Sequence, residues 1–121
     1  MFEGTGVALV TPFTKENAVD YPALGNIIDA VTEGGVDFLV ALGTTAETPT
    51  LTKAEKKQVL DFILDHNKGK LPVVVGIGDY NTHALLDTLA EYTMNRVDGI
   101  LSVAPYYNKP SQEGIYQHFK T

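Results

Sequence analysis

The sequence predicts an α/β fold of parallel strands, made of about four units in which a buried strand is followed by a helix. Two observations predict this fold. Short apolar runs alternate, at intervals of roughly thirty residues, with longer stretches in which apolar residues recur with the helical period. The sequence also lacks the short turn patterns that join antiparallel strands in hairpins, and parallel strands need long crossovers of this kind.

The first unit begins with the apolar run Gly6 to Thr11, which Pro12 closes. Such a run predicts a strand that is buried on both faces. Asp20 is the expected N-cap of the following helix, Pro22 lies in its first turn, and Gly34 with its neighbouring glycine is expected to end it. Four apolar residues spaced i, i+3, i+4 and i+7 share one face of this helix: Leu24, Ile27, Ile28 and Val31.

The second unit pairs the apolar run Phe38 to Leu42 with a helix that begins at Thr52. Thr52 and Glu55 have the spacing of a capping box, in which each side chain accepts a hydrogen bond from an otherwise unpaired backbone N–H. The loop between the strand and the helix runs from Gly43 to Leu51.

The third and fourth units repeat this order. Val73 to Val75 forms the third expected strand and Ile100 to Val103 the fourth, which Pro105 closes. Ser111 is the expected cap of the last helix. The helix behind the third strand carries the apolar residues Leu85, Leu86, Leu89 and Ala90.

The composition narrows the classes of partner and site. Of the 121 residues 44% are apolar and 20% charged, which is typical of one globular domain spanning residues 1–121. The formal net charge of −6 disfavours nucleic acid and anionic membranes as partners. Cysteine is absent, which excludes a disulfide, a thiol nucleophile and a cysteine zinc site. The N-terminus has no signal-peptide pattern, and no apolar run reaches about 18 residues, so we expect a soluble, unprocessed, cytoplasmic chain.

The alternation of strands and helices is shared by two architectures, the doubly wound open sheet and the (β/α)₈ barrel, and does not choose between them. A complete barrel needs about 250 residues. This chain supplies about half of that length and ends inside an expected helix, which favours the N-terminal half of a barrel.

The loops that follow the strands are expected to lie at one edge of the sheet, because parallel strands all end on the same side. After the second strand, Gly43 permits an unusual backbone angle, and Thr44 and Thr45 offer two hydroxyls and two consecutive backbone N–H donors. Such a group can hold a small carboxylate. The alternative is a turn in which the threonines bond only to their own backbone.

Two adjacent tyrosines, Tyr106 and Tyr107, follow the fourth strand. A phenol can relay a proton when it is hydrogen-bonded to another hydroxyl, and Thr44 is expected at the same edge of the sheet. The alternative is a role in packing or in an oligomer interface, where tyrosine is common. Because adjacent side chains usually point in different directions, each tyrosine can have its own role.

Other classes of site have less support. Gly76 and Gly78 follow a strand as in a dinucleotide-binding loop, but Asn81 stands where the third glycine is required. Lys15 and Lys109 lie in loops at the site edge, yet neither directly follows a buried strand, so no imine-forming lysine is expected in the chain. The histidines lack metal-ligand spacing and are expected to be solvated on helix surfaces: His66, His83 and His118.

Three stretches of the sequence carry a family resemblance. They are Gly4 to Phe13, Gly43 to Glu47 with the letters GTTAE, and Pro105 to Gly114 with the letters PYYNKPSQEG. Through these stretches, in register along the whole chain, the sequence resembles the dihydrodipicolinate synthase family. The resemblance implies a (β/α)₈-barrel lyase that condenses pyruvate with aspartate semialdehyde in lysine biosynthesis. It also implies a lysine Schiff base with pyruvate, and no metal or organic cofactor.

The resemblance further implies roles for four residues of this chain. Thr44 and Tyr107 would belong to a hydroxyl proton relay, and Thr45, together with Thr44, would bind the pyruvate carboxylate. Tyr107 would reach across a tight dimer interface into the neighbouring subunit's site, and Tyr106 would lie at that interface. The expected partners are therefore the two substrates and either further copies of the chain, in a dimer or tetramer, or the missing C-terminal half.

The sequence departs from the family pattern at two places. Ala46 stands where the family motif has glycine, which we expect to narrow the backbone angles of the threonine loop. Lys56, Tyr80 and Ala84 stand where lysine-inhibited members have histidine, asparagine and glutamate. Lysine inhibition is therefore expected to be absent or differently built.

The family's imine-forming lysine, third relay tyrosine and semialdehyde-binding arginine would lie beyond Thr121, so we expect the chain alone to be inactive. Two alternatives stay open. One is an N-acetylneuraminate lyase or another 2-keto acid aldolase of the superfamily, although Asn108 to Gly114 is closer to the synthase pattern. The other is a non-catalytic half-barrel module that oligomerises, because a half-barrel leaves unpaired strand edges and exposed apolar surface.

Overall fold

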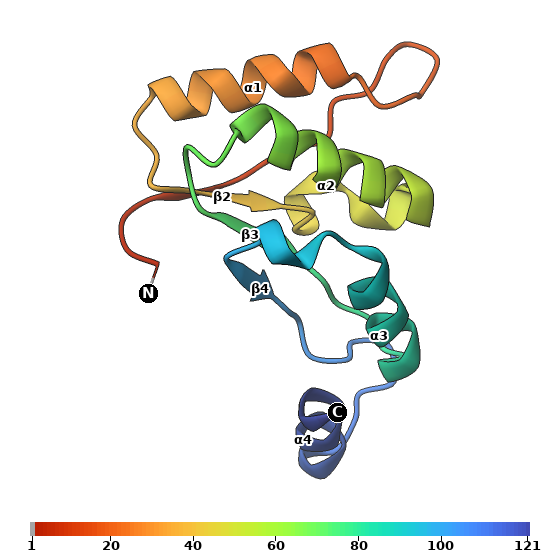
Figure 1. Ribbon diagram of the computed structural model, residues 1–121. Coiled ribbons are helices and arrows are strands. Elements are labelled where there is room, and N and C mark those ends of the chain that lie inside the picture. The colour runs from red at the N-terminus through yellow and green to blue at the C-terminus, as the bar shows by residue number, and fades with distance from the viewer. Residues whose placement is uncertain (1) are drawn as a thin grey trace.

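The centre of the fold is a sheet of four parallel strands whose order in space, β1-β2-β3-β4, is also their order in the chain. The computed structural model describes residues 2–121. The strands are β1 (Gly6–Ala8), β2 (Phe38–Ala41), β3 (Val73–Gly76) and β4 (Gly99–Leu101), and the helices are α1 (Tyr21–Glu33), α2 (Lys53–Asn67), α3 (Thr82–Glu91) and α4 (Gln112–Lys120). A helix follows each strand, so the predicted parallel α/β fold with four strand-then-helix units is confirmed (Figure 1).

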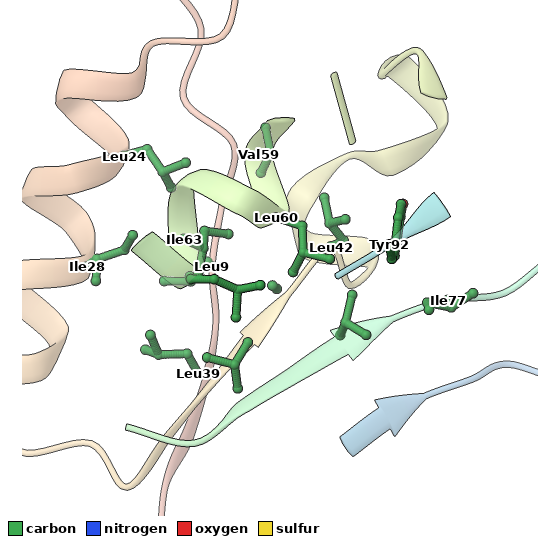
Figure 2. Packing of buried hydrophobic residues seen from close by; sticks show 14 of the residues in the cluster. Leu9, Leu24, Ile28, Leu39, Leu42, Val59, Leu60, Ile63, Ile77 and Tyr92 are labelled. Atoms are coloured by element: carbon green, nitrogen blue, oxygen red, sulfur yellow. The ribbon is translucent and has the colours of Figure 1, made fainter. Parts of the chain in front are cut away.

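The hydrophobic core lies between one face of the sheet and helices α1 and α2, which lie over that face (Figure 1, Figure 2). From the strands, Leu39, Val73 and Val75 are each at most 1% exposed. Burying one such aliphatic side chain contributes about 1.5–3 kcal/mol, so this layer supplies much of the stability of the chain. The helices contribute the fully buried residues Leu24, Ile28, Val59, Leu60 and Ile63.

The other face of the sheet is open. The register sets Ala8 opposite Val40 and Val40 opposite Val74, so these three side chains share a face that points away from α1 and α2. Ala8 is exposed, and Val10, two residues further along the same face, is 44% exposed. The prediction that this first run is buried on both faces is therefore wrong. Its physical reason is that the helices of residues 2–121 that pack on the sheet cover one face only.

The predicted helix caps are confirmed. The Asp20 carboxylate accepts a hydrogen bond from the Ala23 N–H at 2.9 Å, and Ser111 caps α4 through the Gly114 N–H at 3.2 Å. At α2 the capping box is complete: the Thr52 hydroxyl accepts from the Glu55 N–H at 3.2 Å. The Glu55 carboxylate accepts in return from the Thr52 N–H at 2.8 Å, so both side chains satisfy helix-start donors.

The strand ends differ from the predicted ones. β2 ends at Ala41, because Leu42 has a φ of +54° and turns the chain out of the sheet. β4 is Gly99–Leu101 instead of the run Ile100 to Val103. Two short 3₁₀ turns, Thr44–Ala46 and Thr48–Thr50, fill the loop between β2 and α2.

A buried histidine ties α4 to the start of α3. His118 is 8% exposed, and its Nδ1 lies 2.8 Å from the Thr82 hydroxyl. Its expected place on a solvated helix surface is therefore wrong. The reason is tertiary, since α4 packs its His118 face toward the first turn of α3 and hides the ring from water.

Candidate functional site

A cavity of about 690 Å³ lies at the carboxyl ends of the strands. Gly43 and Thr44 line it from the loop after β2, Gly76 to Gly78 from the loop after β3, and Tyr106 from the segment after β4. Loops that follow three different strands thus meet at one edge of the sheet, as the parallel topology predicts. The cavity is the natural place for a small-molecule site in this chain.

The threonine loop is held by backbone turns and by one contact from the segment that follows β1. The Ala46 N–H donates to the Gly43 carbonyl at 3.0 Å, and the Glu47 N–H donates to the Thr44 carbonyl at 3.0 Å. The buried hydroxyl of Thr11 donates to the Ala46 carbonyl at 2.8 Å. This bond joins residues 35 positions apart, so it fixes the turn against the neighbouring strand.

Gly43 does not have the unusual backbone angle that was predicted for it; positive φ angles occur instead at the preceding residue, Leu42, and at Glu47 within the loop. Gly43 is extended, with φ −71° and ψ −176°, whereas Leu42 has a φ of +54°. The Leu42 side chain is 3% exposed in the core, which holds the residue in this costly conformation. The backbone of β3 comes so close to it that a Cβ atom on Gly76 would overlap the Leu42 carbonyl oxygen.

Ala46 fits its place without glycine's freedom. It lies inside the right-handed 3₁₀ turn Thr44–Ala46, is 2% exposed, and is not among the residues with positive φ. The expectation that alanine here narrows the backbone angles of the loop is therefore wrong, because the turn uses angles that any L-residue adopts.

Of the four residues with predicted roles, two line the cavity and two do not. Thr44 and Tyr106 both line the cavity. The structure therefore brings together the threonine loop, Gly43 to Glu47, and the loop Pro105 to Gly114, which we call the tyrosine loop. Thr45 is exposed and lies outside the cavity lining. Tyr107 is 79% exposed and its ring packs against Tyr80, with 5.9 Å between ring centroids.

The far end of the cavity is lined by residues of α2 and α3. Lys53 and Lys56 come from the first turn of α2, and Ala84 from the first turn of α3. Tyr92, which is 8% exposed, forms part of the wall. Its burial, and secondarily the nearby Glu91 carboxylate, raise the pKa of the Tyr92 phenol to about 12, so this hydroxyl stays protonated at neutral pH.

Ser102 is a cavity residue that the sequence did not single out. It lines the cavity just after β4, and its hydroxyl oxygen is buried without a hydrogen-bond partner among residues 2–121. A buried hydroxyl without a partner is costly, which makes a bound water or ligand group a natural occupant. The available signal was a single polar residue in an apolar strand that ends at the site edge.

The histidine and carboxylate side chains bear on metal binding, and the length and apolar character of the helices bear on membrane insertion. Residues 2–121 contain no group of three or more histidine, aspartate or glutamate side chains that could hold a metal ion. His66 instead pairs with Asp29, at 2.9 Å from its Nε2 to the carboxylate. None of the helices described in residues 2–121 combines the length and the apolar character that a membrane crossing requires.

Comparison with known proteins gives consistent matches. The model of the dihydrodipicolinate synthetase family matches residues 1–121. A 4-hydroxy-tetrahydrodipicolinate synthase of Flavobacterium psychrophilum is 55% identical over 119 residues, which make up 98% of this chain and 41% of that protein. The crystal structure of dihydrodipicolinate synthase from Aquifex aeolicus superposes with a TM-score of 0.91 at 44% identity, over 98% of this chain and 40% of that one.

A further structure is that of the chloride-inhibited dihydrodipicolinate synthase from Acinetobacter baumannii complexed with pyruvate. It superposes with a TM-score of 0.94 at 37% identity, over 99% of this chain and 41% of that one. The matches confirm that the four strand-then-helix units form part of a (β/α)₈ barrel. The chain spans about 40% of the length of the curated relatives that it matches.

The family assignment rests on all of the chain. The family model extends over every residue, and relatives close to or above half identity match nearly the full length of the chain. Two of the three stretches that carry the resemblance contribute to the cavity, the GTTAE loop through Gly43 and Thr44 and the segment after β4 through Tyr106. The chain belongs to the dihydrodipicolinate synthetase family.

Proposed function

We propose that the protein to which this chain belongs is a lyase that condenses pyruvate with aspartate semialdehyde through a lysine Schiff base, the reaction of 4-hydroxy-tetrahydrodipicolinate synthase. One observation carries the proposal: Thr44 of the GTTAE loop and Tyr106 of the tyrosine loop line the same cavity. The Flavobacterium relative bears this enzyme name, and the Acinetobacter structure contains pyruvate, which supports the class of substrate.

In this proposal the threonine loop binds the acid end of pyruvate. Thr45 and Thr44 donate hydrogen bonds from their hydroxyls to the carboxylate, assisted by the neighbouring backbone N–H. The geometry that supports these roles is the tight turn that holds Thr44–Ala46, pinned by the Thr11 hydroxyl on the Ala46 carbonyl at 2.8 Å. A turn fixed in this way presents its donors without further ordering, which reduces the entropic cost of binding.

Thr44 and Tyr107 carry the proton in the same proposal. Protons must leave and enter the imine intermediates, and two hydroxyls in a hydrogen-bonded chain can pass them along. Tyr107 is 79% exposed, so its phenol is free to act at the cavity of a second copy of the chain. Tyr106 and Tyr107 together would then form the centre of a dimer interface, since exposed tyrosines are common hot spots of interfaces.

We further propose that residues 1–121 alone do not form the imine. The two lysines of the site-edge loops, Lys15 and Lys109, are exposed to water. Lys53 and Lys56 also line the cavity. An imine between pyruvate and either of these lysines would contradict the proposal. The nucleophile in this scheme comes from the part of the barrel that the chain does not contain.

The test is intact-mass spectrometry of the purified sample before and after incubation with pyruvate and borohydride, with every polypeptide recorded. Borohydride reduces an imine to a stable amine, so the lysine that reacts gains the mass of the reduced pyruvate adduct. The expected result is an adduct on a second, heavier polypeptide and none on the 121-residue chain. An adduct on Lys53 or Lys56 of this chain would contradict the proposed division of the site.

The hydroxyl roles are tested by kinetics on the sample that forms the adduct. Thr44→Val and Tyr107→Phe remove a hydroxyl and keep the shape, so each should lower kcat by roughly 10²–10⁴, the range typical of lost proton transfer. Tyr116→Phe, which changes an exposed phenol on α4, is the matched control and should leave kcat unchanged. If the Thr44→Val variant keeps the wild-type kcat, Thr44 is not part of the proton relay.

The two alternatives have less support. An N-acetylneuraminate lyase or another 2-keto acid aldolase would share the threonine loop, but the relatives and structures named above carry the synthase name. A non-catalytic module that oligomerises is favoured by one observation, the exposed apolar residues at the open face of the sheet, and adduct formation decides between this module and the enzyme.

A further inference from the structure

The ring of Tyr80 contacts the rings of both tyrosines of the tyrosine loop, Tyr106 and Tyr107. Its ring meets the ring of Tyr106 edge to face, with 5.6 Å between centroids and an angle of 90° between ring planes. It meets the ring of Tyr107 at 5.9 Å and 48°. Both distances are within the range at which aromatic pairs attract each other, by about 0.5–1.5 kcal/mol beyond the area that they bury.

The backbone that carries Tyr80 is fixed from both sides. On one side, the Asn81 N–H donates to the Asp79 carboxylate at 2.7 Å. On the other, the Asn81 side chain caps α3 by accepting from the His83 and Ala84 N–H groups. The Thr82 hydroxyl then binds the buried His118 of α4 at 2.8 Å. Tyr80 is therefore anchored by a capped helix start.

The loop that carries Tyr80 also lies close to the segment that follows β4. Gly78 comes so near to this segment that a Cβ atom in its place would lie 2.6 Å from the Val103 side chain. The β3–α3 loop can therefore approach the segment leading to Tyr106 and Tyr107 only because residue 78 has no side chain. This close approach sets the distance across which Tyr80 reaches the two rings.

Tyr107, in contrast, has little support of its own. It is 79% exposed and lies in a segment, residues 102–111, that forms no helix or strand. An exposed tyrosine on such a segment samples several side-chain rotamers unless a neighbouring ring restricts it. The rings of Tyr80 and Tyr107 make the aromatic contact that supplies this restriction within the chain.

We propose that Tyr80 is a positioning residue, whose ring holds Tyr106 and Tyr107 and so fixes where the Tyr107 phenol stands. The inference rests on the proposed function for its catalytic meaning, because Tyr107 matters to the reaction only if it belongs to the proton relay. The physical statement, that the Tyr80 ring orders the Tyr107 ring, stands on the geometry of the chain itself. Tyr80 touches no reacting group in this scheme and acts through Tyr107.

The first test uses aromatic NMR spectra of the 121-residue chain with labelled tyrosines. Ring-to-ring contacts are expected from Tyr80 to both Tyr106 and Tyr107. Tyr80→Leu should move the Tyr107 ring signals toward those of free tyrosine, whereas Tyr80→Phe, which keeps the ring, should preserve them. The control Tyr116→Leu removes a distant exposed ring of α4 and should leave the Tyr107 signals in place. Unchanged Tyr107 signals in Tyr80→Leu would overturn the proposal.

The second test is kinetic and uses the sample in which wild-type turnover is detected. Tyr80→Leu should lower kcat by about tenfold. This loss is smaller than the roughly 100-fold loss that a 1 Å misplacement of a catalytic group can cause, because the Tyr107 phenol is still present and can still reach its position. The KM for pyruvate should stay the same, because Tyr80 is not expected to touch the carboxylate, and Tyr80→Phe should restore kcat. Absence of turnover in a wild-type sample that also contains the second, heavier polypeptide would refute the proposed function, while the NMR result would still decide the positioning role.

Discussion

Leu42, which directly follows β2, and Gly76, the last residue of β3, shape the loop that carries Thr44. Leu42 leaves β2 with a φ of +54°, and its carbonyl rests against the backbone of Gly76. A left-handed conformation in a non-glycine residue costs about 1–3 kcal/mol and persists only when its surroundings hold it. Here the buried Leu42 side chain and the absence of a side chain at residue 76 provide that hold.

Gly76→Ala is expected to lower the free energy of unfolding by about 1–3 kcal/mol, the usual cost of forcing atoms into a filled space. The added methyl group would overlap the Leu42 carbonyl oxygen, so the backbone must shift. Gly43→Ala is the matched control, because a Cβ atom there meets only the Val40 side chain at 3.7 Å, an ordinary contact. Urea denaturation of the three proteins measures the difference. Equal losses in both variants would show that the approach of Gly76 to Leu42 is not tight.

Tyr92 makes stability depend on pH in the alkaline range. Burial is the main cause that raises the pKa of its phenol from 10.0 to about 12 in the folded chain. A raised pKa means that the folded state keeps a proton which the unfolded state loses. The stabilisation is therefore complete below pH 10 and is lost as pH rises from 10 toward about 12.

The free energy of unfolding should fall over this interval by about 2–3 kcal/mol more in the wild type than in Tyr92→Phe, which has no proton to lose. Chemical denaturation at a series of pH values from neutral to alkaline measures both proteins. Because the other tyrosines and the lysines titrate in both, the difference isolates Tyr92. Parallel curves for the two proteins would mean that the Tyr92 phenol is not held protonated by its surroundings.

At the scale of single elements, α2 shows how local chemistry sets a boundary. Its first residue, Lys53, follows a complete capping box of Thr52 and Glu55. The backbone N–H and the hydroxyl of Thr52 also lower the pKa of the Glu55 carboxyl. A lowered pKa means that the contribution of Glu55 is present at neutral pH and is lost as pH falls through the folded pKa.

Thr52→Ala should lower the free energy of unfolding by about 0.5–2 kcal/mol, the usual loss when a helix N-cap is removed. Thr52→Ser keeps the hydroxyl that accepts from the Glu55 N–H and should retain most of the stability. Thermal unfolding followed by circular dichroism compares the variants at neutral pH. A serine variant as weak as the alanine variant would show that the hydroxyl is not the source of the stability.

The elements that depend on local chemistry were predictable from the sequence, and those that depend on tertiary contacts were not. Asp20, Thr52 and Ser111 cap their helices as predicted, because a cap involves only residues three positions apart. The positive φ of Leu42 was not predictable, because its cause is the packing of that side chain into the core. The burial of His118 was missed for the same reason, since its partner Thr82 is 36 residues away.

In the candidate site, too, some features were predictable from the sequence and others depend on tertiary contacts. The meeting of Thr44 and Tyr106 at one cavity follows from parallel topology, which brings strand ends together whatever their distance in sequence. The contact of Tyr80 with the two tyrosines was not predictable, because it requires the close approach that Gly78 permits. The unpartnered hydroxyl of Ser102 was also missed, since strand periodicity alone does not say which polar group lacks a partner.

At the scale of the whole molecule, the chain has one filled face and one open face. The face toward helices α1 and α2 buries its side chains in the core from β1 to β3, while the opposite face carries Val10, Leu101 and Val103 at 44–55% exposure. Leu101 lies on β4, at the edge of the sheet in residues 2–121. Exposed apolar side chains next to a strand edge favour association with another polypeptide.

We therefore expect the 121-residue chain to associate at micromolar concentration, which sedimentation velocity measures. Leu101→Glu combined with Val103→Glu should shift the chain toward the monomer, because burying two added charges in an apolar interface is unfavourable. Asn26→Glu combined with Asn95→Glu adds the same charge at exposed positions away from this face and serves as the control. A compact wild-type monomer would contradict the expectation, and an equal shift in the control would assign the effect to net charge alone.

The identity of spatial and sequential strand order also bears on how the chain is made. Each strand pairs with the one synthesised just before it, so a nascent polypeptide leaving the ribosome always finds its docking partner already formed. The sheet of residues 2–121 can then grow one unit at a time, and none of β2, β3 and β4 waits for a distant segment. A pause in translation after any unit would leave two unpaired edges, at β1 and at the newest strand, and the next unit covers only the second of them.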